Sequence, residues 1–275
     1  MRKIQIVTDS TAYIEKDESI EKNISIVPLS VQFCGRVFKE GFPGEFKDFF
    51  DSLENTNEFP TTSQPAVGDF VEAYVKALQV GEEIISIVIS SELSGTYNSA
   101  RLAADLVAPD RITVIDSKTS AGNLKLLVNR AVQLAEQGVS RSEIEKEVIK
   151  QRENMNANLT VDTLEYLKRG GRLSNTTAFI GSLLNIKPVI GLIDGKLVPV
   201  GKERGKKKAM EAIISMVPEN AERISIAHVQ NYEEALQYKI ELEMKFPNAV
   251  ITIDELGPVI GSHLGPKAIG LCASW

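Results

Sequence analysis

The sequence predicts an α/β protein of two domains, the first built on a parallel, Rossmann-like sheet and the second on a mixed sheet with helices. A chain of 275 residues is long enough for about two domains, each with its own core. Up to residue 155, short β-branched runs alternate with helical patterns, as in a parallel sheet with helical crossovers. After residue 156, a hairpin pattern interrupts this alternation. We therefore place the domains at 1–155 and 156–275.

The first domain is expected to open with the strand Lys3–Val7, which runs into the polar turn Thr8–Thr11. A strand that ends in an acid and hydroxyl groups is typical of the ligand-binding edge of an α/β sheet. Asp9 therefore either contacts a ligand or ties its own turn. Apolar periodicity and turn residues predict the remaining elements: strands at 24–33, 36–38, 84–91 and 111–115, and helices at 45–53, from Pro65, from Thr96, at 121–137 and at 140–154.

Two of these helices begin in segments that are rich in hydroxyl groups, at 60–65 (PTTSQP) and at 90–96 (SSELSGT). Gln64 or Ser63 is the expected N-cap of the first helix, and Ser94 or Thr96 that of the second. Free N–H groups and the positive end of the helix dipole meet at such a start, so an anion can be held there. Capping alone explains the same residues, and both interpretations stay open on this pattern.

The second domain shows its clearest element in a hairpin, with strands at 186–193 and 196–201 joined by Asp194-Gly195. Before it we expect a strand at 159–161, a helix that Asp162 caps and glycines end, and a helical apolar stretch at 176–184. A mixed sheet is completed by strands at 223–228, 249–253 and 268–273, a helix at 232–245, and a glycine-rich turn that carries His263.

Composition and charge argue against several classes of function. The net charge of -6 does not suit a general nucleic-acid binder. Cys34 and Cys272 are far apart in the sequence, so neither a disulfide framework nor a zinc site is expected, and no other metal-ligand spacing is present. No signal peptide is apparent and no apolar run approaches ~18 residues, so we expect no integral membrane segment and a cytoplasmic location.

Enzyme signatures give little support to catalysis by this chain. No P-loop, G-x-G-x-x-G or G-x-S-x-G motif is present, so no nucleotide cofactor is expected. A hydrolase or phosphotransferase with Ser94 as nucleophile and His263 as base is an alternative, although no third residue that would orient the histidine stands out. A regulatory protein whose basic clusters bind an acidic partner or a nucleic acid is another alternative, and the negative net charge argues against nucleic acid. His228 follows a predicted strand and is expected to be a core or edge residue.

Five motifs in this order resemble the DegV family of bacterial fatty-acid-binding proteins, some of which serve as the binding subunit of fatty acid kinase. They are Pro60–Pro65, Ser90–Ala100, Tyr166–Arg172, Lys187–Ala209 and Gly261–Gly265. The resemblance runs from Thr8 to the C-terminal strand. It implies two α/β domains with a long-chain fatty acid in a tunnel between them, and a carrier that presents the carboxylate to an ATP-dependent kinase for conversion to an acyl phosphate. The chain itself would then be non-catalytic and need no cofactor.

The resemblance also implies a set of site residues. Thr62 and Ser94 would hydrogen-bond the carboxylate, with Ser63 and Gly95 beside them and His263 closing the site. Arg172 and Arg204 match positions that are associated with the kinase partner. Hydroxyl and helix N–H groups can replace the hydration of a carboxylate, so no lysine or arginine is needed at the head group, and none lies in the Thr62 or Ser94 motifs. The apolar stretch Phe179–Ile186 is a candidate wall of the tunnel, although an ordinary core segment would look the same.

Overall fold

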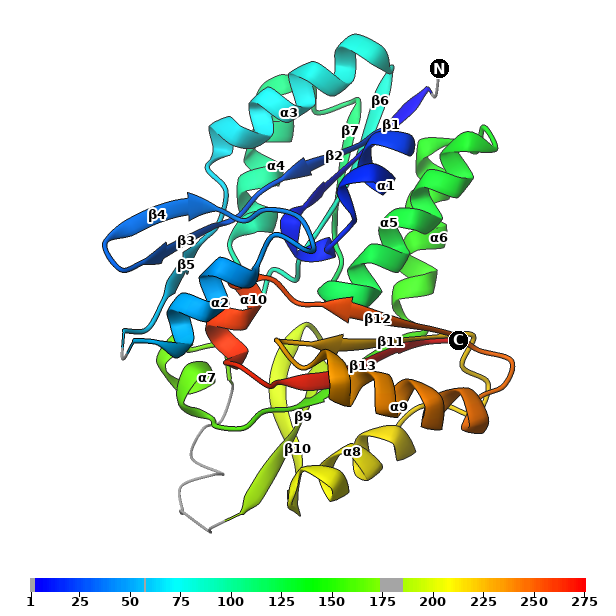
Figure 1. Cartoon of the computed structure of the whole chain (residues 1–275). Helices are drawn as coiled ribbons and strands as arrows, with labels where there is room; N and C mark the ends of the chain where they lie inside the picture. Colours follow the sequence, from blue (N-terminus) through cyan, green and yellow to red (C-terminus); the bar gives the residue numbers. More distant parts are fainter. Residues whose placement is uncertain (1–2, 57, 174–184) are drawn as a thin grey trace.

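The computed structural model describes residues 3–56, 58–173 and 185–275, and in these ranges helices pack around three β-sheets (Figure 1). The strands are β1 (Ile4–Asp9), β2 (Ile24–Val27), β3 (Ser30–Phe33), β4 (Arg36–Lys39), β5 (Thr61–Ser63), β6 (Glu83–Val88), β7 (Ile112–Asp116), β8 (Met155–Thr160), β9 (Ile186–Ile193), β10 (Lys196–Arg204), β11 (Arg223–His228), β12 (Val250–Glu255) and β13 (Ile269–Ser274). The helices are α1 (Lys16–Glu21), α2 (Lys47–Glu54), α3 (Val67–Val80), α4 (Thr96–Val107), α5 (Ala121–Glu136), α6 (Arg141–Arg152), α7 (Glu165–Gly170), α8 (Lys206–Ser215), α9 (Tyr232–Lys245) and α10 (Pro258–Leu264).

The first sheet is parallel, as predicted, with the strand order β2-β1-β6-β7. Its strands are buried on both sides, since α3 and α4 pack in one apolar cluster and α5 and α6 in another. That double cover explains the continuous apolar run in β6. The order places β1 between β2 and β6, so the chain reverses its direction of strand addition at β1. The carboxyl ends of β1 and β6 at such a switch point are the usual ligand-binding edge of an α/β sheet.

The single strand predicted at 24–33 is wrong, because the structure has two strands there. β2 belongs to the parallel sheet, whereas β3 belongs to a small antiparallel sheet of order β4-β3-β5. Pro28 lies between them and has no N–H to donate to a ladder, so pairing is interrupted at that point. The small sheet positions Thr62, whose Cα pairs with that of Val31.

The second sheet is mixed, as predicted, with the order β10-β9-β8-β13-β11-β12. Only β11 and β12 are parallel neighbours among its pairs; the others are antiparallel. The predicted hairpin is β9–β10, and it extends to Arg204, beyond the predicted end, through an irregularity between Pro199 and Gly201. The boundary of the two domains at residue 155 stays a prediction; every strand of the parallel sheet precedes residue 117, and every strand of the mixed sheet follows residue 154.

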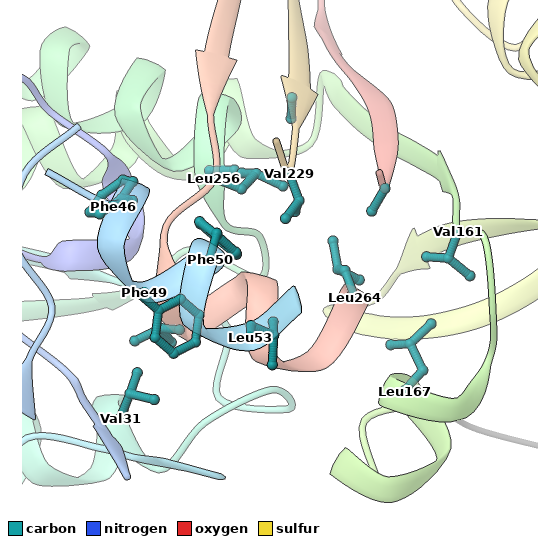
Figure 2. Close-up of a cluster of buried hydrophobic side chains, with 14 of the residues drawn as sticks. Val31, Phe46, Phe49, Phe50, Leu53, Val161, Leu167, Val229, Leu256 and Leu264 are labelled. Carbon is teal, nitrogen blue, oxygen red and sulfur yellow. The ribbon is translucent and has the colours of Figure 1, made fainter. Parts of the chain in front are cut away.

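A third apolar cluster joins the two halves of the chain, and Figure 2 shows much of it. Phe46, Phe49 and Phe50 come from α2 and the residue before it, while Leu256 and Leu264 come from the C-terminal segment. All five are at most 8% exposed. Burial of aromatic side chains at this position contributes about 1.5–3 kcal/mol each. The halves are therefore held together by a core of their own, and a site between them has fixed walls.

The segment that carries His263 is a helix, α10, and the prediction of a turn there is wrong. Gly257, Gly261 and Gly265 recur at intervals of four residues, and each allows a close approach. A Cβ on Gly261 would lie 2.7 Å from the Phe50 ring, and one on Gly265 would lie 2.5 Å from the Tyr166 ring. Glycine has low helix propensity, so tight packing of α10 against its neighbours determines this helix.

Two predicted helix starts also differ from the structure. α3 begins at Val67 rather than at Pro65, since Asp69 accepts a hydrogen bond from the Ala66 N–H (2.9 Å) and so satisfies the first free amide. Asp162 does not cap α7 but accepts a bond from the Lys187 ammonium (2.8 Å). The helix predicted at 176–184 lies outside the described residues.

Candidate functional site

Two side chains that are 201 positions apart in the sequence meet between the halves of the chain. The Thr62 hydroxyl lies 2.7 Å from Nε2 of His263. The antiparallel pairing of β5 with β3 holds Thr62, and the packing of α10 under α2 holds His263. Neither contact depends on local sequence, so only the tertiary fold creates this pair.

The His263 imidazole is neutral at physiological pH. Burial, and secondarily the positive charge of Arg172, lower its pKa to about 4. Nδ1 is buried without a hydrogen-bond partner among the described residues. Buried N–H groups without a partner are rarer in proteins than unfilled acceptors, so we place the proton on Nε2, which donates to Thr62 Oγ1. The Thr62 hydroxyl hydrogen is then free to point into the adjacent cavity.

Ser94 and Gly95 lie where β6 leads into α4, at the ligand edge of the parallel sheet. Ser94 Oγ lies 2.8 Å from Thr96 Oγ1 and accepts a weak bond from the Thr96 N–H (3.3 Å). Gly95 is the N-cap residue of α4, so the prediction that Ser94 or Thr96 is the cap is wrong by one position. A Cβ on Gly95 would lie 1.9 Å from Oε1 of Gln64, so glycine is needed where that side chain crosses.

Two polar side chains fix the walls around this turn. The Gln64 amide donates to Ser99 Oγ (3.0 Å) and so ties β5 to α4. Asp9 is fully buried at the end of β1 and accepts bonds from the Ile89 N–H (2.6 Å) and the Thr11 N–H (2.9 Å). Of the two roles left open for Asp9, the structure favours tying its turn, here to the neighbouring strand.

Arg172 is a residue of this site as well. Its guanidinium donates to the Gly170 carbonyl (2.6 Å) and the Leu93 carbonyl (3.3 Å), both within the site region. Gly170 in turn packs on the imidazole, since a Cβ there would lie 2.2 Å from Nδ1 of His263. The Thr62 and Ser94 motifs contain no cation, but the segment that follows α7 brings this guanidinium to the same cavity.

These side chains enclose a cavity of about 300 Å³. Arg172 lines it, and so do all five of the predicted ligand-binding residues: Thr62, Ser63, Ser94, Gly95 and His263. A second cavity, of about 80 Å³ and almost entirely apolar, continues from it. Four residues line both: Leu93, Leu197, Ile260 and Leu264. The first cavity, here called the polar cavity for the hydroxyl, imidazole and guanidinium groups in its otherwise apolar wall, thus adjoins an apolar one, as an amphipathic ligand with one charged end requires.

The geometry does not favour a catalytic triad. In the described part of the chain, Nε2 of His263 contacts Thr62 and Nδ1 has no partner, so neither Ser94 nor a carboxylate is hydrogen-bonded to the imidazole. A base must contact its nucleophile and is normally oriented by a third group. Within the same residues, no group of three or more His, Cys, Asp or Glu side chains could hold a metal ion.

A family model described as "Uncharacterised protein, DegV family" matches residues 3–274 of this chain. The chain belongs to the DegV family. It is 37% identical to "Protein DegV" of Bacillus subtilis (strain 168) over 275 residues, which are 98% of each sequence. The resemblance seen in the five motifs is therefore confirmed.

Solved structures of DegV proteins confirm the two-domain α/β fold. "DegV, a fatty acid binding protein from Bacillus subtilis" has a TM-score of 0.89 at 36% identity, with 100% of both chains covered. A structure described as "Fatty Acid Binding of a DegV family Protein from Thermus thermophilus" has a TM-score of 0.88 at 35% identity, covering 100% of this chain and 99% of that one. A "fat acid (stearic acid)-binding protein" from Eubacterium ventriosum has a TM-score of 0.88 at 28% identity, covering 100% and 98%.

Several predicted features of this DegV protein lie elsewhere or outside the described ranges. Most of the predicted tunnel wall Phe179–Ile186 falls in residues 174–184, which are not described, and Ile186 does not line either cavity. Arg204 is exposed at the end of β10, away from the residues that line the cavities. His228 is buried at the end of β11, where Nδ1 accepts the Asn231 N–H (3.2 Å), as expected of a core residue.

Arg172 as a cavity residue and Gln64 as a brace were missed at the sequence level. The arginine stands in the motif Gly170-Gly171-Arg172, and Gly171 has a positive φ of 67° that ends α7 and turns the chain back. That Gly-Gly stop was the available signal that the Arg172 side chain is turned back toward the site.

No helix in the described ranges is both long enough and apolar enough to cross a membrane.

Proposed function

We propose that this DegV protein binds a long-chain fatty acid and presents its carboxylate to an ATP-dependent fatty acid kinase. The observation that carries the proposal is the polar cavity of Thr62, Ser94 and His263 that continues into an apolar one. Relatives of the same fold are described as fatty-acid-binding proteins. No cofactor is part of the proposal.

The charged end of the ligand would lie in the polar cavity. A carboxylate taken out of water costs several kcal/mol unless donors replace its hydration. The Thr62 hydroxyl, polarised by His263, the Ser94 hydroxyl and the Arg172 guanidinium are the available donors. The neutral imidazole of His263 adds no charge, so the carboxylate of the ligand would face one cation, the Arg172 guanidinium.

The acyl chain would supply most of the affinity. About 14 methylenes at ~0.8 kcal/mol each give roughly 11 kcal/mol before the cost of ordering the chain is subtracted. The apolar cavity, between Leu93 and Leu264 at one end and Cys272 at the other, is where the chain would enter. A ligand with a carboxylate and a short chain would lose most of that contribution.

The decisive experiment is to extract the purified protein with organic solvent and identify the lipids by mass spectrometry. The proposal expects close to one equivalent of long-chain fatty acid per chain, or uptake of one equivalent of added palmitate or oleate. An empty protein that takes up neither acid contradicts the carrier function.

Thr62→Ala and Ser94→Ala are each expected to weaken fatty-acid binding by about 1–3 kcal/mol, the usual cost of removing one donor from a buried acceptor. Titration of a fluorescent fatty acid measures the change. Thr61→Ala is the matched control, because Thr61 is exposed next to Thr62 and does not line the cavity. Robust ester hydrolysis by the wild type that is lost in Ser94→Ala would instead support the hydrolase alternative.

The kinase step requires docking of a partner, since the chain has no nucleotide-binding motif. In that step a carboxylate oxygen attacks the γ-phosphorus of ATP, and ADP leaves as the acyl phosphate forms. Arg204 is exposed and has no side-chain hydrogen bond or ion pair recorded in the described ranges. Lys202, Lys207 and Lys208 lie close to it in the sequence and are exposed too, so this surface would suit an acidic partner.

Arg204→Ala is expected to leave fatty-acid affinity unchanged and to slow phosphorylation of the bound acid by a fatty acid kinase about tenfold. Turnover is measured across a salt series, because exposed charges are screened by salt. Arg36→Ala, which removes an exposed charge from β4, is the control. Equal turnover by wild type and Arg204→Ala at every salt concentration would remove the docking role. Arg172→Ala, by contrast, should lower both affinity and turnover because Arg172 lines the polar cavity.

A further inference from the structure

A separate polar cavity of about 300 Å³ lies between α5 and the mixed sheet, and the fatty-acid site does not use it. We call it the α5 cleft and define it by Lys22, Lys125, Arg130, Arg223, Asp254 and Ser274. In Figure 1, α5 stands over the ends of β11, β12 and β13, on the side of the molecule away from α7. Among the described residues, only Cys272 lines both this cleft and the apolar cavity.

The mixed sheet forms one wall of the cleft, and the register of its strands places polar residues side by side on that wall. Arg223 of β11 pairs with Ser274 of β13, and two residues on, Ser225 pairs with Thr252 of β12. Side chains alternate between the two faces of a strand, and the intervening residues Ile224 and Ile226 pack in the apolar cluster of α8 and α9. The chain therefore presents polar groups toward α5 at a position where a sheet usually buries apolar residues.

Cations dominate the cleft. Lys22, Lys125, Arg130 and Arg223 line it, and Asp254 is the one acid among its described lining residues. That carboxylate already accepts hydrogen bonds from the Ser225 and Thr252 hydroxyls and lies 3.6 Å from Lys125. Behind the cleft, Glu18 lies 2.6 Å from Lys22 and 3.7 Å from Lys125, and Glu147 lies 4.0 Å from Arg130. For Arg223, no ion pair is recorded among the described residues.

The cleft is also lined by a serine that is almost fully buried, Ser274. Ser274 is 2% exposed and lines the cleft, and no hydrogen bond of its hydroxyl is recorded in the described part of the chain. Buried polar side chains are nearly always hydrogen-bonded, to protein, to water or to a ligand. Its Cα is paired with that of Arg223, so a ligand that meets this hydroxyl lies next to an arginine without an ion pair.

We propose that the α5 cleft binds a small anion that carries phosphate groups. Arginine forks and lysine ammonium groups, with hydroxyls beside them, are the donor set that recognises phosphate oxygens. Glu18, Glu147 and Asp254 already pair with Lys22, Lys125 and Arg130, so Arg223 is the cation of the cleft that is available to an added anion. The fatty acid needs none of these groups, so the α5 cleft serves a different ligand.

Titration calorimetry with inorganic pyrophosphate at low ionic strength tests the proposal. Wild type is expected to bind one equivalent saturably, while Arg223→Gln and Arg130→Gln each weaken binding at least about tenfold. Arg36→Gln removes the same charge from the exposed strand β4 and is expected to bind like wild type. Thermal melting and retained fatty-acid binding verify that each variant is folded.

The outcomes separate specific binding from general charge attraction. Supporting results are weaker binding in both cleft variants together with amide shifts confined to α5, β11 and β13 in a labelled sample. The proposal is overturned if pyrophosphate does not bind, or if Arg36→Gln weakens it as much as Arg223→Gln does. Equal affinity for citrate would overturn the assignment to phosphate.

Discussion

Ala157→Phe is expected to lower the affinity for a sixteen-carbon acid about a hundredfold while changing that for an eight-carbon acid only slightly. Ala157 lies on β8 opposite Cys272 of β13, and both line the apolar cavity of about 80 Å³. A phenylalanine ring there would occupy space that the far end of a long chain needs. Excluding about four methylenes at ~0.8 kcal/mol each costs about 3 kcal/mol, which is roughly two orders of magnitude in affinity.

The measurement compares chain lengths on one variant. A stability loss from overpacking affects both acids alike, whereas a shortened tunnel affects only the long one. Ala157→Ser, which adds little volume, is the control and is expected to bind both acids nearly as wild type does. Equal weakening of both acids by Ala157→Phe would show that the chain does not follow this cavity.

The sequence predicts much of the fold because its signals are local. Apolar periodicity and the turn Asp194-Gly195 each depend on neighbouring residues, and β9–β10 and α6 appear where predicted. The break at Pro28 was missed because the apolar pattern runs through it. The structure separates β2 from β3 since the missing N–H breaks the ladder.

The predicted ligand-binding residues line one cavity, but the geometry of that cavity could not be predicted from the sequence. Thr62 and His263 could be named from their motifs, whereas their contact depends on α10, a helix whose glycines lower its local propensity. The spacing of Gly257, Gly261 and Gly265 was the overlooked signal, because a four-residue repeat of glycine indicates one closely packed helix face. Arg172 could not be placed in the cavity, since the path of the chain after α7 is set by tertiary contacts.

Glu40 is a buried carboxyl group that holds the start of α10. It is 5% exposed, accepts the Ser10 hydroxyl (2.6 Å) on one oxygen and the Val259 N–H (2.8 Å) on the other. Its own N–H donates to the Leu29 carbonyl (2.8 Å), next to the strand that pairs with β5. One residue thereby supports both the helix that carries His263 and the strand that positions Thr62. Burial, the largest cause, raises the pKa of Glu40 from 4.5 to about 7.

This raised pKa makes stability depend on pH in a predictable direction. Between pH 4.5 and 7 the folded chain holds a proton on Glu40 that the unfolded chain has lost, so the free energy of unfolding falls as pH rises through this window. The shift of the Glu40 pKa from 4.5 to about 7 corresponds to a change of about 3 kcal/mol in the free energy of unfolding. The glutamine side chain of Glu40→Gln cannot ionise. We therefore expect the free energy of unfolding of this variant, minus that of wild type, to increase by about the same amount from pH 4.5 to pH 8.

Urea unfolding of both proteins across this range measures the difference. Titrating groups that do not interact with Glu40 act equally in both proteins and cancel; Asp9, whose negative charge is one of the causes that raise the pKa of Glu40, is not one of them. Glu45→Gln, an exposed glutamate in the turn before α2, is the control and is expected to follow wild type at every pH. If the curves of wild type and Glu40→Gln stay parallel, the carboxyl group is not ionising inside this core. A stability of Glu40→Gln relative to wild type that rises with pH would show that α10, and with it His263, is held by a group whose charge changes near neutral pH.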